Sequence, residues 1–498
     1  MKFKVTRLLC GIGTFLPLLA AAQYKPYQDQ TILGSPESYD AGLFAPLEDL
    51  NLISTDEFTV LGHPTFPKYS VRVKKSDFCD GTVNAFTGYI DIEARHLFFY
   101  FFESRSDPEN DDVILWTNGG PGGSSAVGLF MELGPCRVVS ENATEFNPYS
   151  WNEAANVFFI DQPVGVGGSY AEYGESVGTT VEAAKDIAAF VAIFFEHFSK
   201  FKGNGFHMAG ESYGGRYIPV FAAEVYDQNA KLVEAGLTPI NLTSIMIGNG
   251  CTNWLEMFKS YVDMQCQNKT IPPVNSINSC VRMRQFVPRC VKRYTESCID
   301  TFDSIDCAAA NQFCALNLEV PFLNTGRNVY DISEECSPEE YEKTLCYPIT
   351  KYISSYLSRD DTKKTIGLDP VIGNYSLVSW KVNADFWANL DPMFPTQPYI
   401  SALLERGVRT LIYVGANDWI CNWVGNERMT LGLEWTHQDR FNAQSLREWK
   451  INGTAAGVTR SAGPLTFTTI YGAGHMAPYN RPAESLELVR RWLAGSKL

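Results

Sequence analysis

Ser212 lies in a Gly-x-Ser-x-Gly motif between an apolar run, residues 206–209, and a helix-compatible segment, residues 217–222. Small residues on both sides of the serine permit the sharp strand-to-helix turn of a nucleophile elbow. Such a turn exposes the hydroxyl at the positive end of the following helix dipole. The motif alone is frequent by chance. Ser212 is therefore a candidate nucleophile that needs partners elsewhere in the chain.

Two downstream residues complete the order Ser, acid, His, in which each residue follows a strand. Asp418 comes after a predicted buried strand at 410–414, and His475 after another at 467–471. Of the six histidines, His475 alone lies on a glycine-flanked loop after a late strand. Asp418 in isolation is better explained as a turn residue that bonds its own backbone. Together with Ser212 and His475 it is the predicted acid of a catalytic triad.

A glycine-rich loop, residues 119–123, follows a short apolar strand predicted at 113–116. Glycines let backbone N–H groups approach a substrate closely, and a tetrahedral intermediate needs two such donors about 3 Å from its oxygen. The N–H groups of Gly120 and Tyr213 are the predicted donors of this oxyanion hole. The alternative, a loop that cradles phosphate, lacks the Gly-Lys-Ser/Thr ending of that motif.

Together these stretches resemble the serine carboxypeptidase family, from about residue 85 onward. The matching segments are residues 116–125, 132–135, 147–152, 161–165, 210–219, 247–250, 418–426 and 474–476. The resemblance implies an α/β-hydrolase fold, with a mostly parallel central sheet, helices on both faces and an inserted disulfide-rich cap. The alternation of predicted strands with helices at 180–198 and 482–493 favours the same α/β architecture.

The resemblance also implies how a terminal carboxylate is bound without a basic side chain. The corresponding substrate-binding positions are Trp116, Asn118, Gly119, Glu132 and Glu211. Two close carboxyl groups cannot both ionise easily, so one pKa is strongly raised and acidic working conditions follow. Apolar subsites around the cut are implied at Met131, Cys421 and Met476. Without the resemblance, Glu132 and Glu211 are better explained as surface carboxylates.

The sequence departs from the family pattern in the glycine-rich loop. Gly123 stands where the family has a disulfide-bonded cysteine, and residues 374–380, where its partner is expected, contain no cysteine. Both halves of one bridge are therefore missing. The loop must be held by packing or by another link.

Thirteen cysteines are present, nine of them between Cys251 and Cys346. We expect that region, residues 251–365, to be a cap inserted between two parts of one catalytic domain, residues 76–250 and 366–498. The resemblance implies the pairs Cys266 with Cys280, Cys290 with Cys314, Cys298 with Cys307 and Cys336 with Cys346, and Cys79 with Cys136 is a possible fifth. It also implies that Cys421 is an unpaired thiol, which leaves Cys251 over. No metal site or other cofactor is predicted, because Cys-x-x-Cys and paired histidines at ligand spacing are absent.

The N-terminal residues 1–22 have a basic start and an apolar stretch, and are predicted to be a signal peptide. Secretion is the expected route, with the vacuole as the alternative. Residues 23–75 carry no motif, and a removable pro-segment and a mature N-terminal arm both remain open. No membrane anchor is predicted. Five glycosylation sequons are present, at Asn142, Asn241, Asn268, Asn374 and Asn452.

A net charge of −15 argues against nucleic-acid binding. The expected activity is release of C-terminal amino acids from peptides and proteins with a free C-terminus, at acidic pH and through an acyl-enzyme intermediate. Hydrophobic residues are the expected preference. An acyltransferase on the same scaffold is the alternative, whereas a catalytically dead binding protein is disfavoured because all three triad residues are present.

Overall fold

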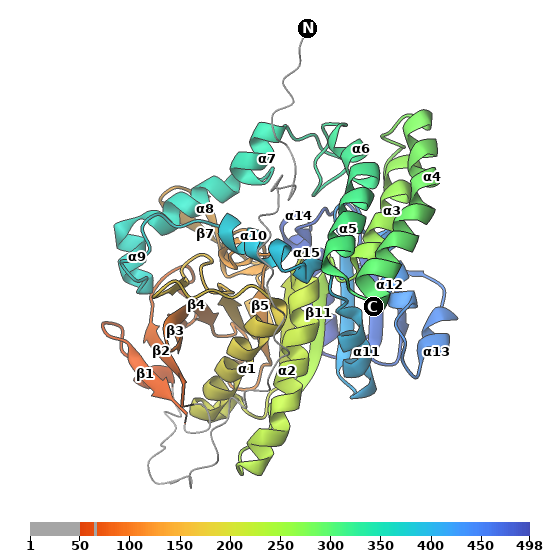
Figure 1. Cartoon of the computed structure of the whole chain (residues 1–498). Helices are drawn as coiled ribbons and strands as arrows, with labels where there is room; N and C mark the ends of the chain where they lie inside the picture. The colour runs from red at the N-terminus through yellow and green to blue at the C-terminus, as the bar shows by residue number, and fades with distance from the viewer. Residues whose placement is uncertain (1–49, 64–66) are drawn as a thin grey trace.

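The computed structural model describes residues 50–63 and 67–498, so the predicted signal peptide, residues 1–22, lies outside the described residues. One sheet of thirteen strands runs through the molecule (Figure 1). Its six central strands are parallel and lie in the order β8 (Asn156–Ile160), β5 (Val113–Thr117), β10 (Phe206–Glu211), β11 (Leu242–Gly248), β12 (Arg409–Gly415) and β15 (Leu465–Ile470). These strands are almost entirely buried and rich in apolar residues, as expected for strands that are covered on both faces.

Helices cover both faces of this sheet. Along β5, Val113 and Leu115 face the core shared with α1 (Thr180–His197) and α2 (Gly214–Glu234). Ile114 and Trp116 face the opposite core, which contains residues of α15 (Pro482–Leu493). The alternation follows from the two-residue period of a strand. The predicted mostly parallel sheet with helices on both faces is confirmed.

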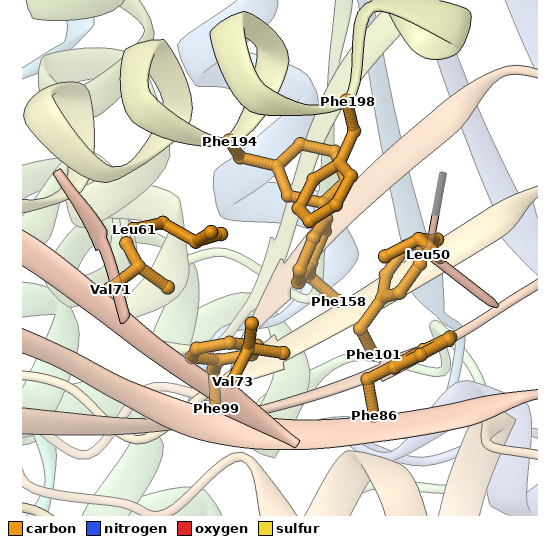
Figure 2. Close-up of a pocket in the computed structure, with 10 residues that line it drawn as sticks. All are labelled: Leu50, Leu61, Val71, Val73, Phe86, Phe99, Phe101, Phe158, Phe194 and Phe198. Carbon is orange, nitrogen blue, oxygen red and sulfur yellow. The ribbon is translucent and has the colours of Figure 1, made fainter. Parts of the chain in front are cut away.

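Antiparallel strands extend the sheet at both ends. They are β1 (Thr59–Gly62), β2 (Tyr69–Lys75), β3 (Ala85–Ile92) and β4 (Arg95–Phe102) on one side, β13 (Arg447–Ile451) and β14 (Thr454–Ala462) on the other, and the short β9 (Tyr170–Ala171) against β4. Figure 2 shows Leu50, Leu61 and Val71 packed around the phenylalanine rings of the core beneath α1. Residues 50–63 and 67–75 thus form part of the catalytic domain's core, ahead of the boundary predicted at residue 76.

The first part of the connection between β11 and β12, residues 251–366, is a helical insertion that stands over the carboxyl ends of the parallel strands (Figure 1). Its helices are α3 (Trp254–Cys266), α4 (Ile277–Tyr294), η5 (Thr295–Asp300), α5 (Ser304–Leu318), α6 (Val320–Leu323), α7 (Pro338–Thr344), α8 (Ile349–Ser358) and α9 (Asp360–Ile366). Helices α3 to α5 share a small apolar core, to which Met393, Trp419 and Val424 also contribute. We call residues 251–366 the cap.

The remaining elements lie outside the cap. They are η1 (Leu50–Leu52), η2 (Gly128–Leu133), β6 (Cys136–Ser140), β7 (Ala143–Phe146), η3 (Trp151–Glu153), η4 (Ser199–Phe201), α10 (Trp380–Ala388), η6 (Asp391–Met393), α11 (Gln397–Glu405), α12 (Trp423–Leu431), α13 (Gln438–Asn442) and α14 (Ala477–Asn480).

Six disulfides join the twelve cysteines of the described residues. Five of them are Cys79–Cys136, Cys266–Cys280, Cys290–Cys314, Cys298–Cys307 and Cys336–Cys346, the pairs named from the sequence. The sixth, Cys251–Cys421, shows that the expectation of an unpaired thiol at Cys421 was wrong. The two cysteines follow neighbouring parallel strands, β11 and β12, and their Cα atoms lie 5.0 Å apart. Sheet order, which the sequence does not state, makes them partners.

The five sequon asparagines are all exposed. Within residues 50–63 and 67–498, no helix has both the length and the apolar character that a membrane span requires.

Candidate active site

Ser212 occupies the sharp turn between β10 and α2. Its φ of 63° places it in the left-handed region, which a non-glycine residue adopts only when its surroundings hold it there. The N–H of Ser212 donates to the carbonyl of Gly248 at 3.1 Å, and its own carbonyl accepts from Gly215 at 2.9 Å. A Cβ on Gly210 would lie 2.9 Å from the carbonyl oxygen of Thr117 on the next strand. The glycine therefore lets the turn pack against β5, and the half-buried serine faces the cleft described below.

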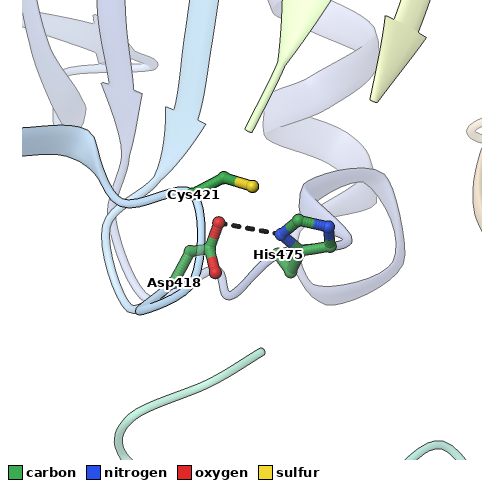
Figure 3. A group of neighbouring side chains, drawn as sticks. All are labelled: Asp418, Cys421 and His475. Atoms are coloured by element: carbon green, nitrogen blue, oxygen red, sulfur yellow. Dashed lines mark hydrogen bonds and ion pairs between the residues drawn. The ribbon is translucent and has the colours of Figure 1, made fainter. Parts of the chain in front are cut away.

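Asp418 and His475 lie on the loops after β12 and β15, which are adjacent parallel strands. Figure 3 shows the two side chains facing each other, with His475 Nδ1 2.8 Å from Asp418 Oδ2. Both side chains are buried. A buried carboxylate in this position can fix the imidazole tautomer and stabilise its charged form, leaving Nε2 to exchange a proton with a nucleophile.

Asn249 holds Asp418 in place, a role that was not predicted from the sequence. Its Nδ2 donates to Asp418 Oδ2 at 2.9 Å, and its Oδ1 accepts from the N–H of Gly415 at 3.0 Å. The N–H of Ile420 donates to the other carboxylate oxygen at 3.1 Å. Asn249 is fully buried and, like Ser212, has a positive φ. The only sequence signal was its place in a Gly-Asn-Gly segment after a strand.

The glycine-rich loop after β5 packs directly on the elbow. A Cβ on Gly119 would lie 2.3 Å from the backbone nitrogen of Tyr213 and 2.8 Å from Ser212 Cβ, so only glycine fits there. Gly120 has a φ of 113°, which also favours glycine. Among the described residues, the N–H groups of Gly120 and Tyr213 donate to no other group. Two backbone donors next to the serine can stabilise an oxyanion.

Backbone pairing with a distant segment replaces the bridge that this loop lacks. Gly123 forms an antiparallel bridge with Val378, and hydrogen bonds of 2.8 and 2.9 Å join residues 122–124 to residues 377–379. Asn383 adds a bond of 3.0 Å from Nδ2 to the carbonyl of Pro121. The loop is thus tied to the region where the family places the partner cysteine.

Glu132 and Glu211 form a buried carboxyl pair beside the triad. Burial raises the pKa of Glu132, and burial together with the neighbouring carboxylate Glu132 raises the pKa of Glu211 well above its usual range. When both groups are ionised, one carboxylate oxygen of Glu132 and one of Glu211 have no hydrogen-bond partner. A proton shared between the two groups satisfies both oxygens, and a pair that retains this proton can donate to an anionic ligand.

Asn118 lies between this pair and the cleft. Its Oδ1 accepts from Trp116 Nε1 at 2.8 Å and from the N–H of Gly128 at 2.9 Å. These bonds turn Nδ2 toward Glu132 Oε1, 3.3 Å away. The amide donor is therefore fixed at the carboxyl pair. The described lining of the cleft contains no Lys or Arg side chain; Arg137 lies behind it and donates to the backbone carbonyl of Glu132 at 3.3 Å.

The three groups Asp418, Cys421 and His475 lie close enough together to resemble a metal site (Figure 3). The Cys421 sulfur, however, is bonded to Cys251 and offers no thiolate. The other two side chains bond each other. The cluster is better explained as a triad pair beside a disulfide.

A cleft of about 1060 Å³ connects these groups. Asn118, Gly119, Gly120, Glu211, Ser212, His475 and Met476 line its inner part, and the cap contributes, among others, Trp254, Ala315, Glu319, Leu323 and Tyr330. Trp116, Met131, Glu132 and Cys421 lie fully buried behind this lining. Tyr330 was not predicted. Its carbonyl accepts the N–H of His475 at 2.7 Å, and its ring packs 5.0 Å from the imidazole.

The parallel sheet, the serine elbow and the Asp418–His475 pair define a hydrolase of the α/β type. Comparisons with known proteins narrow this class. A model of the serine carboxypeptidase family matches residues 79–495. Carboxypeptidase Y of Komagataella phaffii is 40% identical over 515 residues, which cover 97% of this chain and 95% of the relative. The vacuolar serine-type carboxypeptidase ATG42 of Saccharomyces cerevisiae is 40% identical over 435 residues, covering 86% and 83%.

The chain therefore belongs to the serine carboxypeptidase family and is a serine-type carboxypeptidase. A solved structure agrees on the fold. Kex1(delta)p, a prohormone-processing carboxypeptidase from Saccharomyces cerevisiae, superposes with a TM-score of 0.69 at 22% identity, over 86% of this chain and 91% of its own.

Proposed function

We propose that the protein removes C-terminal amino acids from peptides and proteins at acidic pH through an acyl-enzyme on Ser212. Ser212 attacks the last peptide carbonyl, and His475 takes its proton and passes it to the leaving amino group. Asp418 orients His475, while the N–H groups of Gly120 and Tyr213 bind the oxyanion. Water then attacks the acyl carbonyl while His475 takes a proton from the water. His475 returns this proton to the Ser212 oxygen as the acyl group is released.

The buried Glu132–Glu211 pair is the observation that carries this proposal. An exopeptidase must recognise a free carboxylate, and the donors beside the triad are the Asn118 amide and a protonated carboxyl. A pKa raised by burial keeps the shared proton on the pair at acidic pH. Raising the pH removes this proton and places negative charge against the incoming carboxylate, so substrate binding weakens.

The lining of the cleft also supports a hydrophobic preference. Trp254, Leu323, Trp380 and Met476 are among the apolar residues there, and thioether and aromatic side chains accept varied apolar partners. We further propose a secreted or vacuolar location with glycans on the exposed sequons. An acyltransferase activity is disfavoured, because the similar proteins are named as carboxypeptidases.

Steady-state kinetics on a matched pair of peptides test the carboxylate site. One peptide ends in a free acid and the other in an amide, and both are measured from about pH 4 to pH 8. We expect KM for the acid to rise with pH by about tenfold or more, as expected for lost charge-assisted hydrogen bonds, while KM for the amide stays nearly constant. An equal rise for both peptides contradicts the proposed site. In a Glu132→Gln variant, the pH dependence for the acid should be strongly reduced.

A further inference from the structure

Glu319 stands in the wall of the active-site cleft and has no part in the chemistry above. It is the one acidic residue that the described part of the cap contributes to the lining. It caps the C-terminal end of α5, where its N–H donates to the carbonyl of Ala315 at 2.9 Å. The same wall also contains Ala308, Ala309 and Ala315 of α5, whose side chains are small.

The described lining offers Glu319 no positive charge. It contains neither Lys nor Arg, and its other ionisable groups are Glu211, Tyr330, Tyr341 and His475. Glu319 is half-buried in this wall, and a carboxylate that loses part of its water without gaining a cation is destabilised. A proton, or a cation that enters with the substrate, stabilises it.

Elements packed against α5 do not supply that cation. They are α3, α4, η5 and α6. Their charged groups and those of α5 are Glu256, Lys259, Asp263, Arg282, Arg284, Arg289, Lys292, Arg293, Glu296, Asp300 and Asp306. Burial alone raises the pKa of Glu319 to about 7, and none of these groups contributes to the shift. The carboxyl is therefore neutral at acidic pH and ionised above neutrality.

The position of Glu319 relative to the carboxylate site decides which substrate residue meets it. Glu132 and Glu211 are fully buried on the sheet side, so the free C-terminus enters a closed end. The preceding residues of the peptide must leave through the mouth of the cleft, which is lined by the cap together with residues 377–390. A cap residue at the junction of α5 and α6 thus faces the acyl part of the substrate.

We propose that Glu319 is a specificity-determining residue that binds a Lys or Arg side chain on the acyl side of the scissile bond, at the penultimate residue or the one before it. The inference rests on the proposed carboxypeptidase reaction and names a substrate class for it. At acidic pH the protonated Glu319 tolerates apolar acyl-side residues. As the pH rises, the ionised carboxylate forms a charge-assisted hydrogen bond with the basic side chain.

Paired peptides with the same free C-terminal Leu test this assignment. They carry Lys or Leu at the penultimate residue, or at the residue before it, and are measured at pH 5 and pH 8. Because both peptides share one C-terminus, the effect of pH on the carboxylate pair cancels in the Lys-to-Leu ratio of kcat/KM. We expect that ratio to increase about tenfold between the two pH values, in line with one charged hydrogen bond.

Glu319→Gln should leave the Lys-to-Leu ratio of kcat/KM nearly constant with pH, because the amide does not ionise. Glu342→Gln, which removes an exposed cap carboxylate outside the cleft lining, is the matched control and should behave as the parent. A ratio that is flat with pH in the parent, or that still rises in Glu319→Gln, overturns the inference. The inference is also overturned if Glu319→Gln changes the preference for the C-terminal residue instead of the preference for the acyl-side residue. If free-acid peptides are not cleaved at all, the proposed function itself fails.

Discussion

The sheet and the cap are built by different means, and they contribute different things to one cleft. The sheet side sets Ser212, Asp418 and His475 on three loops after parallel strands, each fixed by several backbone or amide hydrogen bonds. The cap has a small apolar core, and four of the six disulfides lie wholly within it. The residues that carry out the reaction therefore lie on loops of the sheet, whereas the cap wall is expected to determine which substrates bind.

This contrast predicts that changes on the sheet side affect all substrates alike, whereas changes in the cap wall alter the ratio between substrates. Glu319→Gln, described above, is the cap test. Two further variants test the sheet, and one reagent tests the link between the two regions.

The largest effect is expected for Ser212→Ala. Loss of the nucleophile should lower kcat by about 10⁴-fold or more for every peptide, because the acyl-enzyme cannot form. The melting temperature should remain close to that of the parent, because the half-buried side chain of Ser212 faces the cleft and its removal leaves no cavity in the core. Release of amino acids from a peptide library, together with thermal unfolding, measures both. Near-normal activity in the purified variant rules out Ser212 as the nucleophile.

An intermediate effect is expected for Asn249→Ala. This variant removes one donor to Asp418 and the acceptor for Gly415, and an unpaired buried group costs about 1–3 kcal/mol. We expect kcat to fall about ten- to a hundredfold with KM nearly unchanged, equally for acyl-side Lys and Leu peptides. Thr430→Val, which changes another buried polar residue away from the cleft, serves as a control. A change in KM alone indicates that Asn249 is not a positioning residue for Asp418.

The smallest effect is expected for a thiol reagent. The Cys251–Cys421 bridge joins the base of the cap to the loop that carries Asp418, so the native protein should have no reactive thiol at the cleft. Mercurials should leave activity unchanged until the protein is reduced, because the thiolate is the reactive species. Titration of free thiols in the folded protein gives a direct count. Rapid inhibition that a Cys421→Ser variant abolishes shows that the bridge is open.

The sequence by itself determined much of the sheet side. The predicted helix at 482–493 coincides with α15, and that at 180–198 exceeds α1 by one residue, because periodic apolar spacing and Pro at the helix start are local signals. The strands before Ser212, Asp418 and His475 were recognisable as short apolar runs, which are also local signals. The motifs around those residues also indicated the family that the comparisons found.

Only the tertiary structure decided which distant segments meet. The pairing of Cys251 with Cys421 depends on β11 lying beside β12, and the tie between residues 122–124 and 377–379 depends on the chain returning after the cap. Glu319 carries no motif of its own, and the Gly-Asn-Gly segment around Asn249 does not state which residue Asn249 bonds. Asn249 bonds Asp418, and Glu319 lies in a cleft wall without positive charge. Both environments arise from contacts between residues far apart in the chain, and no local sequence pattern encodes such contacts.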